Sequence, residues 1–216
     1  VELNRLASHM LFIGTYAIDL GAMTPVMYGF RERERIQNLF EAVTGARMMH
    51  NYFRIGGLKE DVPENFVAEV REVLDLVKKD TEESDKLLSF NEIFLARLKN
   101  IAVMTAEDAI DYGLTGPCLR ASGVDYDLRK AVPYSVYDRF DFDVPIGLDG
   151  DCWDRYYLRV QEIYQSVRII EQALDQLPHG EVVSSLGRRL IRPPAGEVYV
   201  RGENPRGEIG VYLVSD

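Results

Sequence analysis

The stretch ELNRLASHMLFIGTYAIDLGAMTPVMYGF, residues 2–30, decides the fold that we predict for this chain. Its apolar residues recur at spacings of three and four, which indicates one face of an α-helix that ends near Gly21. The members of this face are Leu3, Leu6, Ala7, Met10, Leu11, Gly14, Ala17 and Ile18. Two ionisable residues, His9 and Asp19, lie in the same run. A buried carboxylate costs on the order of 2 kcal/mol or more unless it is paired, protonated or hydrated, so Asp19 either caps or pairs at the helix end or serves a functional site.

The composition is that of a globular protein with an acidic surface. The 216 residues are 46% hydrophobic and 28% charged, and 35 acidic against 25 basic residues give a net charge of −10. This balance excludes the basic stripe that nucleic-acid binding requires, so we expect no nucleic-acid partner. Cys118 and Cys152 form no CxxC pair and the three histidines are scattered, so the chain predicts no metal site of its own. No apolar run reaches the ~18 residues of a membrane-spanning helix.

Two further helices are predicted in the first half of the chain. Thr24 and Pro25 supply an N-cap followed by proline at the first helical position, and Gly45 ends this second helix. Pro63 is expected to open a third helix, which gives way to a charged stretch at residues 80–86.

The segment between these helices, Arg47 to Gly57, is dense in long and aromatic side chains and ends in a glycine pair, which predicts a tight turn. Arg47 and Arg54 bracket it. These two arginines could hold an anionic or electron-rich group, or they could pair with local carboxylates such as Glu60 and Asp61.

Residues 114–150 differ from the rest of the chain because they are rich in Gly, Pro, Asp and Tyr and keep no helical period. We expect a long irregular segment with short extended pieces at residues 137–144. Such segments inside a compact domain are usually functional or buried against a partner. Arg120 is a candidate for contacts there.

The clearest periodicity follows at residues 153–177, where apolar residues alternate spacings of three and four. This pattern predicts a long helix inside a bundle, capped by Asp149 or Asp151. Two β-prone runs at residues 197–200 and 209–214 then predict a hairpin around an Asn-Pro-Arg-Gly turn.

The expected fold is therefore mainly α. Residues 1–180 form a helical bundle with an irregular segment at 114–150, and residues 181–216 form a linker and a small β hairpin. The chain has no GxGxxG, P-loop, HExxH or nucleophile elbow, so an enzyme acting alone is not indicated.

Several stretches together resemble one known family. In chain order they are ELNRLASH (2–9), AIDLGAMTP (17–25), FRERE (30–34), the segment 47–57, DYGLTGPCLRASGVDYDLRKAVPY (111–134), FDVPIGLDGDCWDRY (142–156) and GEIGVYLVSD (207–216). They cover nearly the whole chain in the family's order and resemble the quinone-site subunit of respiratory complex I, called the D subunit in bacteria and the 49-kDa subunit in mitochondria. This family descends from the large subunit of nickel–iron hydrogenases, so the resemblance implies a bundle of that type.

The resemblance implies a subunit of a proton-pumping NADH:quinone oxidoreductase that is not active alone. Its place would be the peripheral arm at the cytoplasmic face of the cell membrane, with no transmembrane segment. Its partners would be the subunit that holds the terminal iron–sulfur cluster, other peripheral-arm subunits and a membrane subunit at the quinone channel. Quinone would be the substrate, while NADH and the clusters would be held by other subunits. The alternative is a non-catalytic helical module that only scaffolds partner subunits.

The resemblance also implies site residues. Asp19 matches the family's aspartate that pairs with a histidine upstream of Val1, and the pair would move a proton during quinone reduction. Thr15, one helical turn earlier, would line the quinone chamber. His9 is a further candidate on this helix, although packing in the bundle explains it equally well. The candidates for facing the cluster or a partner subunit are Arg47, Met49, His50, Arg54 and Arg120.

The chain departs from the family's pattern in two places. Family members often carry a histidine where Met49 stands, and here His50 comes one residue later, so we expect the cluster potential to depend weakly on pH. The connection at residues 188–195 is shorter than is usual in the family. Because the chain begins inside a helix without a methionine, we expect it to be a piece of a longer protein.

Overall fold

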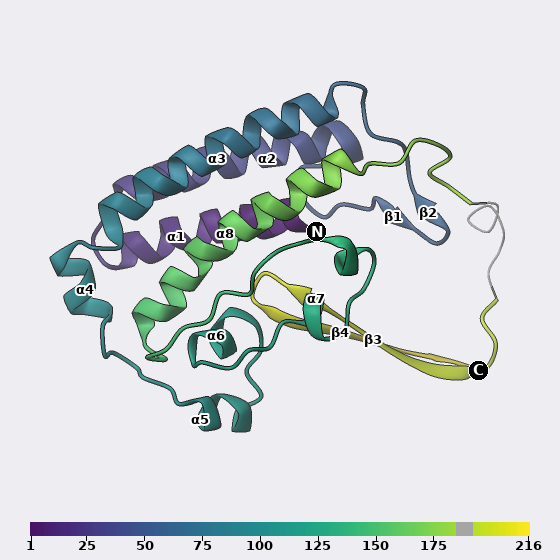
Figure 1. Ribbon diagram of the computed structural model, residues 1–216. Helices are drawn as coiled ribbons and strands as arrows, with labels where there is room; N and C mark the ends of the chain where they lie inside the picture. The colour runs from purple at the N-terminus through teal and green to yellow at the C-terminus, as the bar shows by residue number, and fades with distance from the viewer. Residues whose placement is uncertain (185–191) are drawn as a thin grey trace.

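Four long helices build the body of the protein (Figure 1). The computed structural model describes residues 1–184 and 192–216. The long helices are α1 (Glu2–Asp19), α2 (Thr24–Thr44), α3 (Phe66–Leu88) and α8 (Cys152–Asp175). Helices α1 and α3 each contact both α2 and α8, so the four close into a ring around one apolar core. The prediction of a mainly α fold is confirmed, while likeness to the hydrogenase bundle stays a prediction.

Helices α1 and α2 approach each other closely because glycines stand at their crossing. A Cβ on Gly14 would lie 2.9 Å from the Cα of Val26, and one on Gly29 would overlap the carbonyl oxygen of Met10. The apolar face predicted for α1 supplies much of the core, and Leu6 is fully buried in it. Burial of such side chains contributes roughly 1.5–3 kcal/mol each.

Local signals set most helix ends correctly. Gly45 ends α2 in the left-handed conformation at φ +76°, and Asp151 caps α8 by accepting a hydrogen bond from the Asp154 amide. The expected cap by Thr24 is wrong, because α2 already includes Thr24 and no side chain caps it. Pro25 lies in its first turn as predicted.

Helix α3 is displaced from its prediction at both ends. It begins at Phe66 rather than Pro63, and it runs through the charged stretch 80–86 to Leu88. Two buried members of that stretch have partners that keep the helix intact: Asp80 pairs with Arg31 of α2, and the Thr81 hydroxyl donates to the carbonyl of Val77.

Short elements connect the bundle. They are β1 (Phe53–Arg54), β2 (Gly57–Leu58), α4 (Glu92–Leu98), α5 (Ala106–Asp111), α6 (Gly116–Ala121), α7 (Leu128–Ala131) and the 3₁₀ helix η1 (Tyr137–Arg139). Strands β1 and β2 are antiparallel, so the turn predicted at the end of segment 47–57 is confirmed.

The segment 114–150 is less irregular than predicted, since it holds α6, α7 and η1. The extended pieces expected at 137–144 form no strand. Instead, the amides of Asp141 and Asp143 donate to the side chains of Gln172 and Gln165 on α8. The backbone of this segment is therefore hydrogen-bonded to side chains of α8 rather than to a neighbouring strand.

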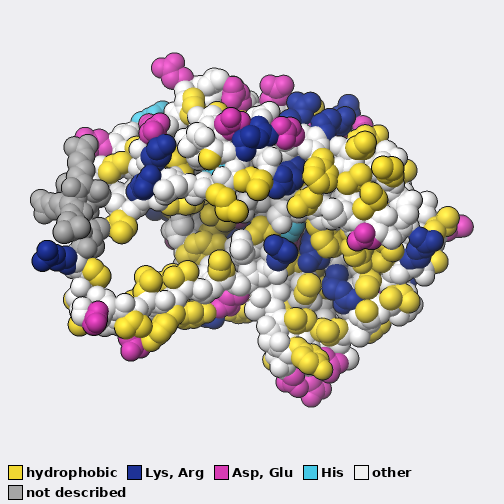
Figure 2. All heavy atoms as spheres, turned by 180° about the vertical axis from the view of Figure 1, so that it is seen from behind, with side chains coloured by type: hydrophobic (Ala, Val, Ile, Leu, Met, Phe, Trp, Pro, Cys, Tyr) yellow, Lys and Arg dark blue, Asp and Glu magenta, His cyan; other side chains and the backbone are white. Residues whose placement is uncertain are grey.

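The predicted C-terminal hairpin is confirmed as β3 (Gly196–Asn204) paired antiparallel with β4 (Gly207–Ser215). Its stem projects from the bundle and exposes apolar side chains (Figure 2). Its tip is buried: Glu203 is 3% exposed. The short connection expected at 188–195 falls largely outside the described residues.

Candidate functional site

Thr15 and Asp19 lie exposed, one turn apart, at the C-terminal end of α1. The apolar side chains of Ile18, Met23 and Met27 are exposed around them. The Thr15 hydroxyl donates to the carbonyl of Leu11 at 2.9 Å. The two predicted residues thus lie near exposed apolar side chains and near the guanidinium of Arg97, which donates to the carbonyl of Leu20 next to Asp19.

The Asp19 carboxylate has no stabilising partner among residues 1–184 and 192–216: no hydrogen bond or ion pair reaches it there. Because it is exposed, it carries none of the desolvation cost considered above. Its position at the last residue of α1 opposes the helix dipole, which costs about 0.3–1 kcal/mol. Neither a cap nor a salt bridge within the described chain therefore explains this residue.

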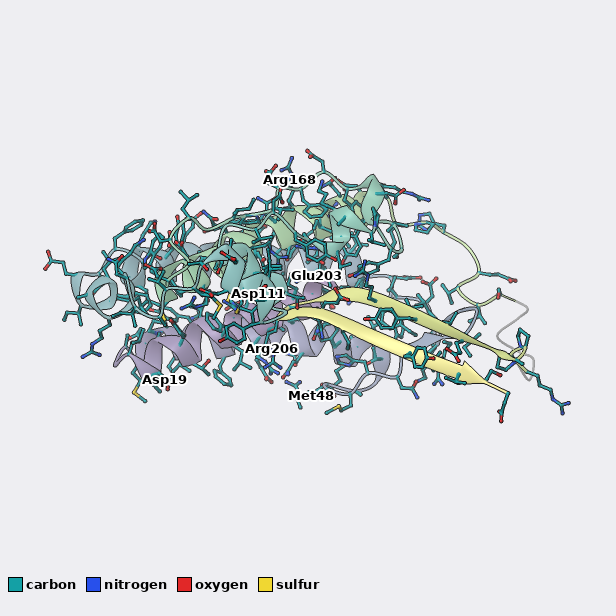
Figure 3. The ribbon with its side chains drawn as sticks, turned by 90° about the horizontal axis from the view of Figure 1, so that it is seen from below. Asp19, Met48, Asp111, Arg168, Glu203 and Arg206 are labelled. Carbon is teal, nitrogen blue, oxygen red and sulfur yellow. The ribbon has the colours of Figure 1, made fainter. Side chains whose placement is uncertain are left out.

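A groove of about 580 Å³ lies near the other end of α1. Its walls come from α1, α2 and the segment 47–53, and the predicted residues Arg47, Met49 and His50 all line it. The groove reaches Ala7 on α1, so it lies roughly 18 Å along that helix from Asp19, at 1.5 Å per residue. Figure 3 shows Asp19 and Met48 along the same edge of the molecule. The structure thus places Thr15 and Asp19 at one position on this side and Arg47, Met49 and His50 at another.

Within this segment, Met49 and His50 point in different directions. Met49 is 89% exposed and has a left-handed backbone at φ +57°, which is unusual for a residue other than glycine. The His50 ring packs 4.4 Å from the ring of Phe40, and its Nδ1 lies 3.1 Å from the carbonyl oxygen of Ala46. Met49, not His50, therefore presents its side chain outward.

The two bracketing arginines differ as well. Arg47 pairs with Glu34 and Glu41 of α2, so the alternative that it pairs with local carboxylates is confirmed, although its partners are not the examples Glu60 and Asp61. The segment folds back along α2, so Glu34 and Glu41 lie within ion-pair distance of Arg47. Arg54 lies exposed on β1.

His9 does not share the surface of Thr15 and Asp19. Its side chain is 1% exposed, and its Nε2 lies 2.8 Å from Oε2 of Glu162 on α8. Burial lowers the pKa of His9, against the opposing effect of the Glu162 carboxylate. A neutral His9 that donates from Nε2 to Glu162 fits this geometry. The placement of His9 at the chamber is therefore corrected to a position between α1 and α8.

Arg120 is also buried, so its expected role on a partner-facing surface is corrected. Its guanidinium donates to Glu162 at 2.6 Å and to Glu203 at 2.9 Å, and Asp127 lies 3.5 Å away. Burial alone would raise the pKa of Glu162, but the hydrogen bond from His9 and the charge of Arg120 outweigh it and lower that pKa. The ion pair between Arg120 and Glu162 thereby connects segment 114–150 to helix α8.

A buried ionic cluster surrounds these contacts, and sequence reasoning missed most of it. The residues in it are Glu2, Arg5, His9, Arg120, Asp127, Arg129, Glu162 and Glu203. Glu2, Arg5 and His9 recur at spacings of three and four, so they share one stripe of α1, but this stripe lies outside the predicted apolar face and no local signal marked it as buried. Nothing local indicated Glu203 or Asp127.

Two negative findings concern the described residues only. No group of three or more histidine, cysteine, aspartate or glutamate side chains there could hold a metal ion. None of the helices in that part of the chain has the length and apolar character needed to cross a membrane.

Comparisons with known proteins agree on one family. Residues 19–191 match the family described as the respiratory-chain NADH dehydrogenase 49 Kd subunit. The chain is similar over its whole length to proteins named as the D subunit of NADH-quinone oxidoreductase: 49% identical to that of Desulforamulus reducens, 50% to that of Bacillus mycoides and 49% to that of Carboxydothermus hydrogenoformans. It spans 58–59% of the length of these relatives. The chain therefore belongs to the family of the 49-kDa subunit of respiratory-chain NADH dehydrogenase, which includes the D subunit of the bacterial NADH-quinone oxidoreductases.

Proposed function

We propose that this chain is part of the subunit of a proton-pumping NADH:quinone oxidoreductase that forms one wall of the quinone-reduction chamber. In this proposal the chain is not active alone. It belongs to the peripheral arm at the cytoplasmic face of the membrane, next to the subunit that holds the terminal iron–sulfur cluster and to a membrane subunit at the quinone channel. Family membership supports the enzyme class, and the surface around Asp19 supports the place of the site.

The observation that carries the proposal is the carboxylate of Asp19, which has no hydrogen-bond or ion-pair partner among residues 1–184 and 192–216. It is exposed among Ile18, Met23 and Met27, beside Thr15, at a helix end where its charge is unfavourable. Exposed apolar side chains beside an ionisable group suit a quinone, because the ring and tail need apolar contact while the ring oxygens need hydrogen bonds and protons.

Quinone reduction to quinol takes up two electrons and two protons. The role assigned to Asp19 is to pair with a histidine outside this chain and to stabilise that histidine's positive charge. When the histidine gives its proton to the quinone oxygen, Asp19 loses its cationic partner. Each group sets the proton affinity of the other, so the pair titrates as a unit. The change of charge is then available to trigger movement toward the membrane subunits.

The outward face of segment 47–54 is assigned to the neighbouring cluster-bearing subunit. Met49 stands exposed there on a strained backbone, and Arg54 is exposed nearby. Strained backbone conformations persist where surrounding structure enforces them and are frequent at binding sites. No cofactor is assigned to this chain by itself.

Replacing Asp19 with asparagine in the complete enzyme tests the proposal. Asp19→Asn removes the charge and keeps the shape, so assembly should be preserved while quinone reduction slows by about 10²-fold or more, the usual contribution of a positioned acid–base group. Steady-state NADH:quinone activity measures the effect. NADH oxidation with an artificial acceptor that takes electrons ahead of the quinone should be unchanged.

Asp111→Asn is the matched control, since Asp111 is also an exposed aspartate at the end of a helix, α5, and lies elsewhere on the surface (Figure 3). It should leave both activities unchanged. Wild-type quinone reduction in Asp19→Asn would favour the alternative, a helical module that only scaffolds its partners.

A further inference from the structure

The tip of the β3–β4 hairpin is held in the bundle by charged groups. Arg5 of α1 donates to the carbonyl oxygens of Glu203 and Asn204 at 3.0 and 3.2 Å. The Glu208 amide donates to the Thr115 hydroxyl at 2.9 Å. The Glu203 carboxylate accepts from Arg120, and its side chain is 1% exposed. The tip is therefore docked, whereas the stem beyond it is exposed.

The guanidinium of Arg120 forms ion pairs with three carboxylates, those of Glu162, Glu203 and Asp127. Asp127 has a second cation, because Arg129 binds it at 2.7 Å, and Glu162 accepts a further hydrogen bond from His9. Among the ion pairs of the described residues, Glu203 depends on Arg120 alone. The negative charge of Glu203 is therefore the least compensated among the three carboxylates that pair with Arg120.

The ion-paired members of the cluster include one more carboxylate than guanidinium groups, and the buried guanidinium of Arg159, which lies near His9, forms no ion pair with these carboxylates among the described residues. The four carboxylates, Glu2, Asp127, Glu162 and Glu203, face three guanidiniums, Arg5, Arg120 and Arg129, and all seven are at most 6% exposed. His9 adds a positive charge only if it is protonated, and Arg5 and Arg159 both oppose its protonation. An uncompensated charge in a buried site is strongly unfavourable, and binding a proton removes it.

We propose that the carboxyl group of Glu203 is a buried proton-binding site, and that proton uptake there tightens the docking of the hairpin tip onto helices α1, α6 and α7. The proton converts the carboxylate into a neutral carboxylic acid, which still accepts a hydrogen bond from Arg120. No other bond forms or breaks.

The groups that face Glu203 support this site. They are Arg5 on α1, Arg120 on α6, Asp127 before α7 and Tyr134 after it. Burial raises the pKa of Glu203 against the opposing charge of Arg120, and the nearby Asp127 raises it further. The pKa values of Glu2, Asp127 and Glu162 are lowered, so those three remain ionised when Glu203 takes up its proton.

The direction of the pH effect follows from linkage. A carboxyl whose pKa is raised by docking binds its proton more tightly in the docked state. The docked tip is therefore favoured at low pH, and this advantage is lost as the pH rises from the ordinary glutamate pKa of about 4.3 through the raised value.

Hydrogen–deuterium exchange of the purified enzyme complex, read on peptides that cover residues 199–210, tests the proposal. Corrected for the intrinsic pH dependence of exchange, the tip amides should exchange faster as the pH rises from about 5 to about 8, by up to roughly tenfold for each unit by which docking raises the pKa. Glu203→Gln mimics the protonated state, so its exchange should stay slow and independent of pH.

Glu208→Gln is the matched control on the same hairpin, since Glu208 pairs with Arg201 outside the cluster. It should keep the wild-type pH dependence. A flat wild-type curve, or a Glu203→Gln curve that still follows the wild type, would overturn the proposal.

Infrared spectroscopy of the wild type provides a second test that requires no variant to assemble. A protonated carboxyl has a carbonyl band distinct from that of a carboxylate, and this band should decrease over the same pH range in which exchange accelerates. Exchange that accelerates without a titrating carboxyl band would equally overturn the proposal. Neither measurement needs turnover, so the outcome is independent of the result for Asp19.

Discussion

Two ionisable residues of α1 have opposite surroundings although they lie ten positions apart on one helix. Asp19 is exposed at the helix end, whereas His9 is enclosed against Glu162. The helical period did not predict this difference, because His9 lies outside the predicted apolar face of α1 and is buried by its contact with Glu162 on α8. The assignment of Asp19 to a quinone site stays a prediction that the enzyme must test.

Met49 gives a second prediction at the residue scale. In the complete enzyme, Met49→His should introduce a pH dependence into the midpoint potential of the neighbouring terminal cluster. A protonated imidazole stabilises the reduced cluster, so the potential should rise as the pH falls, by at most about 59 mV per pH unit for a one-electron couple. Redox titration followed by electron paramagnetic resonance measures it.

The control for this variant is Ile55→His, which adds a histidine at another exposed position on the same segment, outside the groove that Met49 lines. Its potential should vary with pH as weakly as that of the wild type. An unchanged pH dependence in Met49→His would show that Met49 does not face the cluster.

At the level of elements, the close approach of α1 and α2 depends on glycine. Gly29→Ala should lower the free energy of unfolding of the full-length subunit by about 1–3 kcal/mol, because the new methyl group overlaps the carbonyl of Met10 and must push the helices apart. Chemical denaturation measures it. Gly202→Ala is the comparison: its Cβ would meet only the Tyr134 ring at 3.6 Å, an ordinary contact, and stability should change little.

The start of α8 gives another element-scale prediction, since two aspartates were candidates for its cap. Asp151 accepts hydrogen bonds from the amides of Asp154 and Asn100, each at 2.9 Å, and it is fully buried. Asp151→Ala should therefore destabilise the full-length subunit by about 2 kcal/mol in thermal unfolding. Asp149→Ala removes only an exposed pair with Lys99 and should cost less than about 1 kcal/mol. Equal effects would contradict the assignment of the cap.

For the whole molecule, the ionic cluster joins parts of the chain that are far apart in sequence. Glu162→Gln should destabilise the full-length subunit by about 3 kcal/mol near neutral pH, because His9 and Arg120 lose a buried anionic partner. The lowered pKa of Glu162 means that its contribution is present above about pH 4.3 and is lost as the pH falls further. Denaturation curves of the variant should accordingly converge with those of the wild type in acid.

Glu171→Gln is the control on the same helix. Glu171 forms a half-exposed pair with Lys78, and its loss should cost less than about 1 kcal/mol. An equal loss of unfolding free energy in both variants would mean that the buried ion pairs of Glu162 stabilise the subunit no more than the half-exposed pair of Glu171 does.

The sequence by itself determined the four long helices, the hairpin and the family. Glycine at the end of α2, aspartate at the start of α8 and the β-prone runs of β3 and β4 act on the backbone within a few residues, so they can be recognised locally. Only the tertiary structure decided which charged groups are buried. Arg120 and Glu203 meet across 83 residues, and His9 and Glu162 across 153. Such contacts arise from the packing of distant elements, for which no local pattern in the chain is a signal.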